Sequence, residues 1–511
     1  MSEALETVPQ EQIGKKIATQ SPWVLIAILL HVAGVAVASI MYYARESSTD
    51  DTAPTEITVS TAPVVEQILP PEIVDREEVP KLKDQDITPS DLTEFDPDAT
   101  DEPEQGDPTE LSNLPSGDTT GGSAIGVTGP GHHGIAPSTH GGRKPGGKYG
   151  SRFGKGGKGG AGGRVNEAIT AGLEWLRKHQ DEDGRWDCEK FMKHDKEGEP
   201  CTGAGSPVND VGVSGLALLA FLGEGNTMKI GTYREVVRKG VKWIIEQQNQ
   251  DNGLIGQNAS SAYVYSHAIA TVALCEAYGL SDNLRSLKKP AQSAINYIAQ
   301  ARNPYGVWRY QPRDNDNDTS ITGWMVQALL SAKAFGLAYD DAALKASIVW
   351  FDGVTDATGA SGYLKVGDGS SRPVGKQAKF PQSKTEALTA VVLLCRYLME
   401  QDPKDCKTMG PAAETIMRKP PVWDPNDGSI DMYYWYYASY AMYQVGGSQW
   451  DAWARKMTDA AVKTQLKDGN PKGSWDPIDP WGEDGGRVYS TAIMVLCLEA
   501  YYRYGKVSFG R

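Results

Sequence analysis

Apolar positions in residues 166–505 follow a helical period and alternate between two kinds of segment. One kind is amphipathic, carries Lys and Glu on one face, and ends in a turn with Gly and Trp. The other begins with small residues and is apolar nearly all round, which is typical of a buried helix. The pair recurs six times, at intervals of about 50 residues. The turns read Trp175-Leu176…Gln180…Gly184-Arg185-Trp186, Trp243-Ile244…Gln248…Gly253, Tyr297-Ile298…Gly306-Val307-Trp308, Gly362-Tyr363 and Gln465…Gly473-Ser474-Trp475.

A helical hairpin of this kind cannot bury its apolar face alone, so neighbouring hairpins must stack. Six of them close into a ring, in which charged segments such as 236–248 and 288–300 form the outer layer and the apolar segments form the inner layer. The inner segments that start at Asp210 and Asp318 place a carboxylate where a helix start has free N–H groups. The sequence therefore predicts an all-α fold, an (α/α)6 toroid over residues 165–507.

An apolar segment precedes this toroid. Residues 22–43 carry no charge apart from the titratable His31, and they are long enough to span a hydrocarbon core of about 30 Å. Lys15 and Lys16 precede the segment, which indicates a cytoplasmic N-terminus. A cleaved signal peptide is the rival interpretation, but the apolar run continues past Val37-Ala38-Ser39 to Tyr43. We predict a cytoplasmic tail at 1–21, a single-pass anchor of the inner membrane at 22–43, and a periplasmic toroid.

Residues 44–164 have the composition of a linker. Their first half is rich in Asp, Glu, Pro and Thr, and residues 121–164 are rich in Gly and carry only basic charges. Neither half has enough apolar side chains to form a core. We predict a long disordered tether between the membrane and the toroid.

Charge and cysteine content restrict the partners. The net charge of −14 disfavours nucleic acid. Cys188 and Cys201 flank a polar loop, where a disulfide is chemically allowed outside the cytoplasm. His179 and His194 complete a zinc-type set with these cysteines, but the spacing matches no standard ligand pattern. We predict no metal ion and no cofactor.

Two further motifs carry a family resemblance. They read Gly306-Val307-Trp308-Arg309-Tyr310 and Asp318-Thr319-Ser320-Ile321-Thr322-Gly323-Trp324. Together with the turns, they resemble the bacterial prenyltransferase/squalene-oxidase repeat proteins, of the superfamily that includes terpenoid cyclases and protein prenyltransferases. The resemblance covers residues 166–504. It implies an α/α toroid in which each turn Gln bonds to neighbouring backbone and each turn Trp packs against it.

The chemistry of that superfamily carries over only in part. Class II cyclases donate a proton from the middle Asp of Asp-x-Asp-Asp-Thr, and the matching stretch here reads Asp314-Asn315-Asp316-Asn317-Asp318-Thr319. Alignment on Asp318-Thr319 places the amide of Asn317 where the acid is needed, and an amide cannot donate that proton. Asp316 and Asp318 remain the candidate catalytic acids.

Other activities of related folds lack their motifs. The Asp-x-Cys and downstream His that hold zinc in protein prenyltransferases are absent from the sequence, as is the Cys-Gly-Glu-Gln of thioester domains. Asp314, Asp316 and Asp318 alternate as in a calcium loop, but the turn Gly and the bidentate Glu of an EF-hand are missing. Glu386 with Asp316 is a further alternative, as the acid pair of a glycosidase or lyase.

The N-termini of the inner helices gather at one mouth of such a ring and add free N–H groups there. The residues predicted to bind a ligand at this mouth, beside Asp316 and Asp318, are Tyr265, His267, Trp324, Glu386, Trp435, Arg487 and Tyr489. They favour non-catalytic binding of a lipid-like, glycan or peptide ligand in the central cavity. The alternative is a class II terpenoid cyclase with an Asp as general acid.

Overall fold

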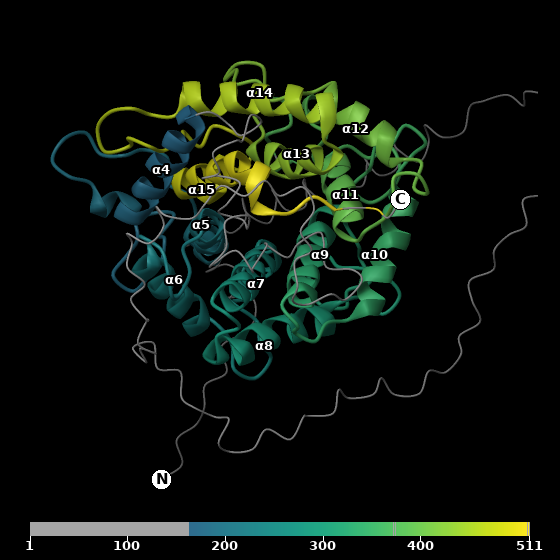
Figure 1. The fold of residues 1–511 in the computed structure, drawn as a ribbon, viewed down its shortest axis with the longest axis horizontal. Coiled ribbons are helices and arrows are strands. Elements are labelled where there is room, and N and C mark those ends of the chain that lie inside the picture. Colours follow the sequence, from purple (N-terminus) through teal and green to yellow (C-terminus); the bar gives the residue numbers. More distant parts are fainter. Residues whose placement is uncertain (1–162, 371, 374, 508, 510–511) are drawn as a thin grey trace, which may run out of the picture. The chain divides into compact units, whose positions relative to one another are not determined.

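The computed structural model describes residues 163–370, 372–373, 375–507 and 509 (Figure 1). The predicted tail, the predicted membrane anchor and nearly all of the predicted linker lie outside these residues. In the part of the chain that is described, no helix combines the length and apolar character needed to cross a bilayer.

Every regular element among the described residues is helical, and the helices form six hairpins. The outer helices lie at the periphery of Figure 1, and the inner helices lie between them. The outer helices are α4 (Gly163–Lys178), α6 (Arg234–Glu246), α8 (Arg285–Ala301), α10 (Asp341–Val354), α12 (Met409–Met417) and α14 (Gly447–Thr464). The inner helices are α5 (Asp210–Glu224), α7 (Tyr263–Leu280), α9 (Thr319–Ala334), α11 (Ala387–Leu398), α13 (Met432–Val445) and α15 (Gly482–Arg503). Short 3₁₀ helices are η4 (Phe191–His194), η5 (Pro207–Asn209) and η6 (Gln382–Lys384).

Each inner helix packs against the next inner helix, and α15 packs against α5, so the inner layer is a closed ring. The inner helices are buried on nearly all sides, whereas the outer helices bury one face. The predicted all-α toroid is confirmed. The physical reason is the one read from the sequence, since only a ring of hairpins covers both faces of every inner helix.

The turn glutamines join successive hairpins. Each donates from Nε2 to the carbonyl of its own turn Gly and to a carbonyl of the following outer helix, so one side chain ties two repeats together. The pairs of acceptors are Gly184 and Val236 for Gln180 (both 3.0 Å), Gly253 and Pro290 for Gln248 (3.2 and 2.9 Å), and Gly473 and Ala168 for Gln465 (2.9 and 2.8 Å). The expected structural role of the glutamines is confirmed.

The turn tryptophans act within a hairpin. Each indole Nε1 donates to a carbonyl of the preceding outer helix, and each ring is buried. The bonds are Trp186 to Leu176 (2.8 Å), Trp308 to Ile298 (2.9 Å) and Trp475 to Ala461 (2.8 Å). The turn glycine is needed for a separate reason: Gly473 has φ +96°, and a Cβ there would lie 2.3 Å from the carbonyl oxygen of Ala171.

The two predicted helix caps have different outcomes. Asp318 caps α9 as predicted, because its side chain accepts a hydrogen bond from the Ile321 N–H. Asp210 does not cap α5: its Oδ1 accepts from the Cys188 N–H at 3.0 Å, and its Oδ2 lies 3.2 Å from Arg185 Nη1. The carboxylate of Asp210 therefore holds the first turn against its inner helix.

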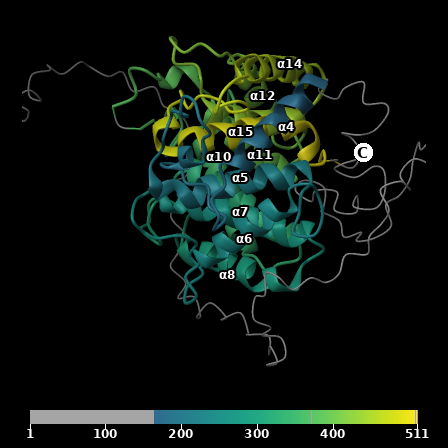
Figure 2. The same ribbon diagram turned by 90° about the vertical axis from the view of Figure 1, so that its left-hand side faces the viewer.

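The ring closes where α15 meets α4 and α5, the last and first helices of the toroid (Figures 1 and 2). A fully buried ion network lies on this seam. Arg503 of α15 pairs with Glu276 of α7 at 2.6 Å and with Glu499 at 3.2 Å, and Tyr504 donates to Glu276 at 2.8 Å. One guanidinium therefore balances two carboxylates that have no access to water.

Replacing Arg503 by Met should remove the guanidinium that pairs with two buried carboxylates. We expect the free energy of unfolding to fall by about 3–5 kcal/mol, the usual effect of breaking a buried pair on one side. Denaturant unfolding of the full chain measures this. The matched control is Lys463→Met in the exposed Lys463–Asp459 pair of α14, which should change stability little. Equal losses in the two variants would contradict the role assigned to the network.

Candidate functional site

A cavity of about 430 Å³ lies among the first turns of the inner helices and the loops that lead into them. Its walls come from α5, α7, α9, α13 and α15. The lining is mostly apolar or aromatic, with hydroxyl and amide groups among it. The lining residues are Val208, Asn209, Gly212, Val213, Leu216, Ser260, Ser261, Ala262, Tyr265, Ser266, Ile269, Tyr310, Ser320, Trp324, Pro373, Tyr433, Trp481, Asp484, Gly485, Tyr489 and Ile493.

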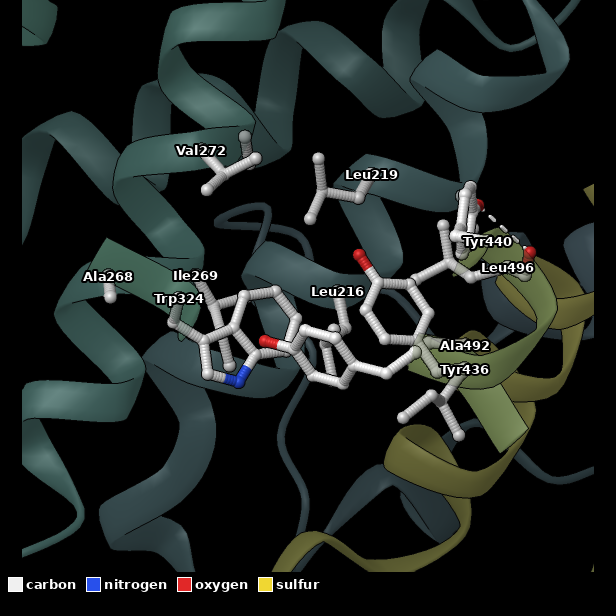
Figure 3. Close-up of a cluster of buried hydrophobic side chains, with 14 of the residues drawn as sticks. Leu216, Leu219, Ala268, Ile269, Val272, Trp324, Tyr436, Tyr440, Ala492 and Leu496 are labelled. Carbon is white, nitrogen blue, oxygen red and sulfur yellow. Dashed lines mark hydrogen bonds between the residues drawn. The ribbon is translucent and has the colours of Figure 1, made fainter. Parts of the chain in front are cut away.

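Larger side chains fill the centre of the ring further along the same helices (Figure 3). Leu216, Ile269 and Trp324 belong both to the cavity wall and to this buried cluster. Trp324 stacks on Tyr436 with ring centroids 5.5 Å apart and an interplanar angle of 14°. The Tyr440 hydroxyl donates a hydrogen bond to the Leu496 carbonyl at 3.0 Å. The hollow is therefore closed at its inner end by the protein's own side chains.

Asp318 is buried and does not line the cavity, although it lies two residues before the lining residue Ser320. Its Oδ1 accepts from the Ile321 N–H at 2.8 Å, and its Oδ2 accepts from the Tyr363 hydroxyl at 3.3 Å. Arg309 Nε lies 4.0 Å from the same Oδ2. Burial raises the pKa of Asp318 to about 6, against the lowering effect of these donors. One oxygen therefore caps α9, and the other accepts from the segment after α10.

A second buried acid lies behind Tyr489. The Tyr489 hydroxyl donates to Asp479 Oδ2 at 3.0 Å, and the N–H groups of Met432 and Trp481 also donate to this carboxylate, at 3.1 and 3.2 Å. Asp431 lies nearby, caps α13, and pairs with Arg372 at 2.9 Å. Burial, and then the charge of Asp431, raise the pKa of Asp479 to about 7.

The cavity wall itself is nearly neutral. Burial raises the pKa values of Tyr265, Tyr433 and Tyr489 above the ordinary phenol value, so these side chains present neutral hydroxyls. Among the lining residues, Asp484 is the one with a charged side chain, and it is exposed. The wall therefore offers aromatic faces and hydroxyl groups but no cation.

Three residues that were predicted to bind a ligand, Tyr265, Trp324 and Tyr489, line the cavity. His267 does not, because it faces the outer layer. Its Nδ1 accepts from the Ile255 N–H at 3.0 Å, and its Nε2 lies 3.2 Å from the Ala294 carbonyl oxygen of α8. Burial lowers its pKa to about 3, so it is a neutral hydrogen-bonding residue that joins two layers.

Three other predicted ligand-binding residues also lie away from the cavity. Glu386 forms an ion pair with Lys419 of the segment after α12. Trp435 is buried beside Trp423, with ring centroids 6.1 Å apart. Arg487 holds the first-repeat loop instead, since its Nε donates to the Thr202 carbonyl at 2.7 Å and its Nη2 pairs with Asp476 at 2.7 Å.

The candidate acid Asp316 points into solvent. Its side chain is 69% exposed and pairs with Arg309 at 3.2 Å, whereas Asp318 is fully buried. The two carboxylates therefore occupy opposite environments, and neither lines the cavity. Asn317, at the acid position of the cyclase motif, accepts from the Val307 N–H at 2.7 Å and holds the turn.

Sequence reasoning missed several residues of the cavity wall and its support. Tyr433 was passed over for Trp435 in the aromatic run, although the spacing 433, 436, 437 and 440 is that of one helix face. Tyr310 and Trp481 lie on loops, where no period marks the inward side. No feature of the sequence indicated that Asp479 is a functional residue, apart from its place between Pro477 and Pro480.

One cluster of metal-ligand type occurs in the described part of the chain, at His179, Asp195 and Cys201. None of these residues borders the cavity. The six cysteines are all free thiols, so Cys188 and Cys201 are not joined. Cys188 instead donates from Sγ to Asp210 Oδ1 at 3.0 Å.

No model of a known family matches the chain, and no curated protein matches it. Solved structures that match it include an inactive variant of an α-1,6-mannanase of Salegentibacter sp. (12% identity, TM-score 0.44, covering 66% of this chain and 99% of that one). Others are a cellobiose 2-epimerase from Bacillus thermoamylovorans (13%, 0.44, 66% and 98%) and a type II terpene cyclase variant from Scytonema (12%, 0.41, 66% and 97%).

Asp479 gives the toroid a pH dependence of defined sign. The ordinary pKa of this carboxyl is 3.8, and in the folded chain it is raised to about 7. Between these values the folded state keeps a proton that the unfolded state has lost, so the free energy of unfolding falls as pH rises. The stability of the wild-type chain relative to Asp479→Asn should therefore be greatest below about pH 4 and decline towards about pH 7.

Urea denaturation of both chains across this pH range measures the effect. Asp316→Asn, at an exposed carboxylate, is the control and should show no comparable trend. A difference between wild type and Asp479→Asn that stays constant with pH would show that Asp479 titrates alike in both states.

Proposed function

We propose that the toroid binds a lipid-like ligand in its central cavity and does not catalyse a reaction on it. The observation that carries the proposal is the chemistry of the wall. Val213, Leu216, Ile269 and Ile493 give it an apolar inner part, and Trp324 gives it a broad aromatic face. Apolar walls with a few placed polar groups are typical of small-molecule sites.

The arrangement of polar groups favours a lipid-like ligand over a glycan or a peptide. Ser260, Ser261, Asn209 and Asp484 belong to the loops and helix starts at the outer end, whereas the deeper positions carry aliphatic side chains. A glycan or peptide buried there would leave its hydroxyl or amide groups unpaired, at a cost of about 1–3 kcal/mol each. An isoprenoid or acyl chain has no such groups, and its polar end would meet the hydroxyls at the mouth.

The wall also selects against an anionic head group. Among the described residues, no Lys or Arg lines the cavity, and Asp484, whose carboxylate is exposed, is one of the lining residues. A neutral end group, such as the hydroxyl of a prenol, fits this charge distribution. The volume of about 430 Å³ lies within the range of small-molecule sites, about 300–1,000 Å³.

A terpenoid cyclase is the alternative function, and one observation favours it. Asp318 is a buried carboxyl beside an aromatic cavity, with a pKa raised to about 6. Its geometry argues for a structural role, because Ile321 and Tyr363 occupy its two oxygens. Donation of a proton to a substrate from this position would require these bonds to break, so binding remains the better supported function.

Farnesol is a suitable probe for the proposed site. We expect saturable binding of one molecule per chain by equilibrium dialysis of the full chain, and at least about 10-fold weaker binding, equivalent to about 1.4 kcal/mol, in Ile269→Trp, which fills the cavity. Val349→Trp on α10, where Val349 is 71% exposed, is the matched control and should bind like wild type. An uncharged oligosaccharide and a Trp-containing peptide, tested in parallel, should bind more weakly.

Two outcomes would contradict the proposal. Equal farnesol binding by wild type and Ile269→Trp would place the ligand elsewhere. Formation of a cyclic product from squalene by the wild-type chain, lost in Asp318→Asn, would establish the cyclase instead.

We also propose that residues 22–43 anchor the toroid to the inner membrane from the periplasmic side. The support is the length and apolar character of this segment and the lysines before it. In a bacterial host the full chain should remain with the membranes after a salt wash and be released by detergent, and the toroid should be accessible to protease in spheroplasts. Deletion of 22–43 should release the protein from the membrane, whereas an equally long deletion at 90–111 in the linker should not. A membrane-bound 22–43 deletion would contradict the anchor.

A further inference from the structure

A compact group of nitrogen, oxygen and sulfur ligand atoms lies at the end of the first outer helix, apart from the cavity. One ring nitrogen of His179, a carboxylate oxygen of Asp195 and the Sγ of Cys201 all lie within 4.8 Å of one another. The side chains of His179 and Asp195 are 3% and 7% exposed, and Cys201 is 4% exposed. These are three different ligand types in a largely dry site.

The hydrogen bonds of His179 leave its second nitrogen facing an acceptor. Nδ1 lies 2.8 Å from the Trp175 carbonyl oxygen, which can only accept, so Nδ1 carries a proton. Nε2 faces Asp195 Oδ1 at 3.1 Å. A lone pair on Nε2 and a carboxylate oxygen repel each other unless a proton or a cation lies between them. Backbone carbonyls orient metal-binding histidines in this way.

The carboxylate of Asp195 also contacts Cys201, which is the third ligand. Asp195 Oδ2 accepts from the Cys201 N–H at 2.6 Å, which fixes the Cys201 backbone beside the carboxylate. Metal–ligand lengths of about 2.0–2.3 Å place the ligand atoms of a tetrahedral site roughly 3.3–3.6 Å apart. The 3.1 Å separation of His179 Nε2 and Asp195 Oδ1 is close to that value, and the Cys201 Sγ lies within 4.8 Å of the other two ligand atoms.

The surrounding residues hold the group in place. Trp175 stacks on the His179 ring with centroids 4.0 Å apart, and Phe191 packs edge-on against both rings. The loop that carries Asp195 and Cys201 is fixed from the last repeat, because Asn470 Oδ1 accepts from the Lys196 N–H at 2.9 Å and Asn470 Nδ2 donates to the Lys196 carbonyl at 3.0 Å. A site with such support is organised before a ligand arrives.

We propose that His179, Asp195 and Cys201 bind one Zn²⁺, with a water molecule as the fourth ligand. Zinc accepts imidazole, carboxylate and thiolate together, whereas calcium and magnesium require oxygen ligands alone. His179 follows α4, and the loop that bears the other two ligands is held by Asn470 and Arg487 of the sixth repeat. The ion therefore stabilises the seam where the ring closes, and this role is independent of the ligand in the cavity.

Cobalt(II) is the spectroscopic probe for this site. The full chain, stripped with a chelator and titrated with Co²⁺, should bind one ion with a thiolate-to-cobalt charge-transfer band, and Zn²⁺ should displace it. The band should be lost in Cys201→Ser and retained in Cys406→Ser, the matched control at the partly exposed Cys406 outside the site. Zinc should also raise the melting temperature of the stripped wild-type chain but not that of Cys201→Ser.

His179→Gln keeps the thiol and removes one ligand, so it tests the site even where Cys201→Ser folds poorly. It should bind Zn²⁺ more than about 10-fold more weakly than wild type, since loss of an outer-shell partner alone has an effect of about 10–100-fold. Absence of the band in the folded wild-type chain, or its persistence in Cys201→Ser, would overturn the proposal. The former result would leave the hydrogen-bonded contact between His179 and Asp195 as the whole function of the group.

Discussion

Closure of the ring is the constraint on which the other features of the toroid depend. Each inner helix is apolar on nearly every side, so it is stable only between two inner neighbours and an outer helix. Five of the six contacts between inner helices join hairpins adjacent in sequence, but the contact of α15 with α5 joins elements more than 250 residues apart. Like Gln180 and Gln248, Gln465 donates to a carbonyl of the next outer helix. Its acceptor is Ala168 of α4, so this bond crosses the seam. Without the seam, both terminal hairpins would expose apolar surface to water.

The cavity is a consequence of side-chain size along the inner helices. At the mouth, small residues such as Gly212, Ser266, Ser320 and Gly485 line the hollow. Further along the inner helices, the centre of the ring holds Leu219, Val272, Tyr436 and Leu496 (Figure 3). The helices α5, α7 and α15 contribute to both regions, so along them the change from open to filled accompanies a change in side-chain size. The ring geometry thus provides a space, and the local sequence decides how much of it stays empty.

The fold could be predicted because its signals are local and repeated. The Gln, Gly and Trp of each turn act through bonds to the nearest backbone, so their spacing survives in the sequence. The cavity wall was predictable only in part. Tyr265, Trp324 and Tyr489 lie on helices with a readable period, whereas Tyr310 and Trp481 come from loops without one. His267 and Trp435 were misplaced because a helix that is apolar all round gives no indication of which face is inward.

The two buried acids explain why an aromatic cavity in this chain supports binding better than catalysis. Neither Asp318 nor Asp479 lines the hollow, and their oxygens accept from backbone N–H groups at a helix start or turn and from tyrosine hydroxyls. A general acid must keep a proton and have a free path to the substrate. Asp318 as a cap stabilises α9 by about 0.5–2 kcal/mol, and that stabilisation requires the carboxylate to accept bonds. Oδ1 of Asp318 caps the helix, and proton donation from Oδ2 would require its bond from Tyr363 to break, so the hydrogen bonds observed for Asp318 are those of a structural carboxylate.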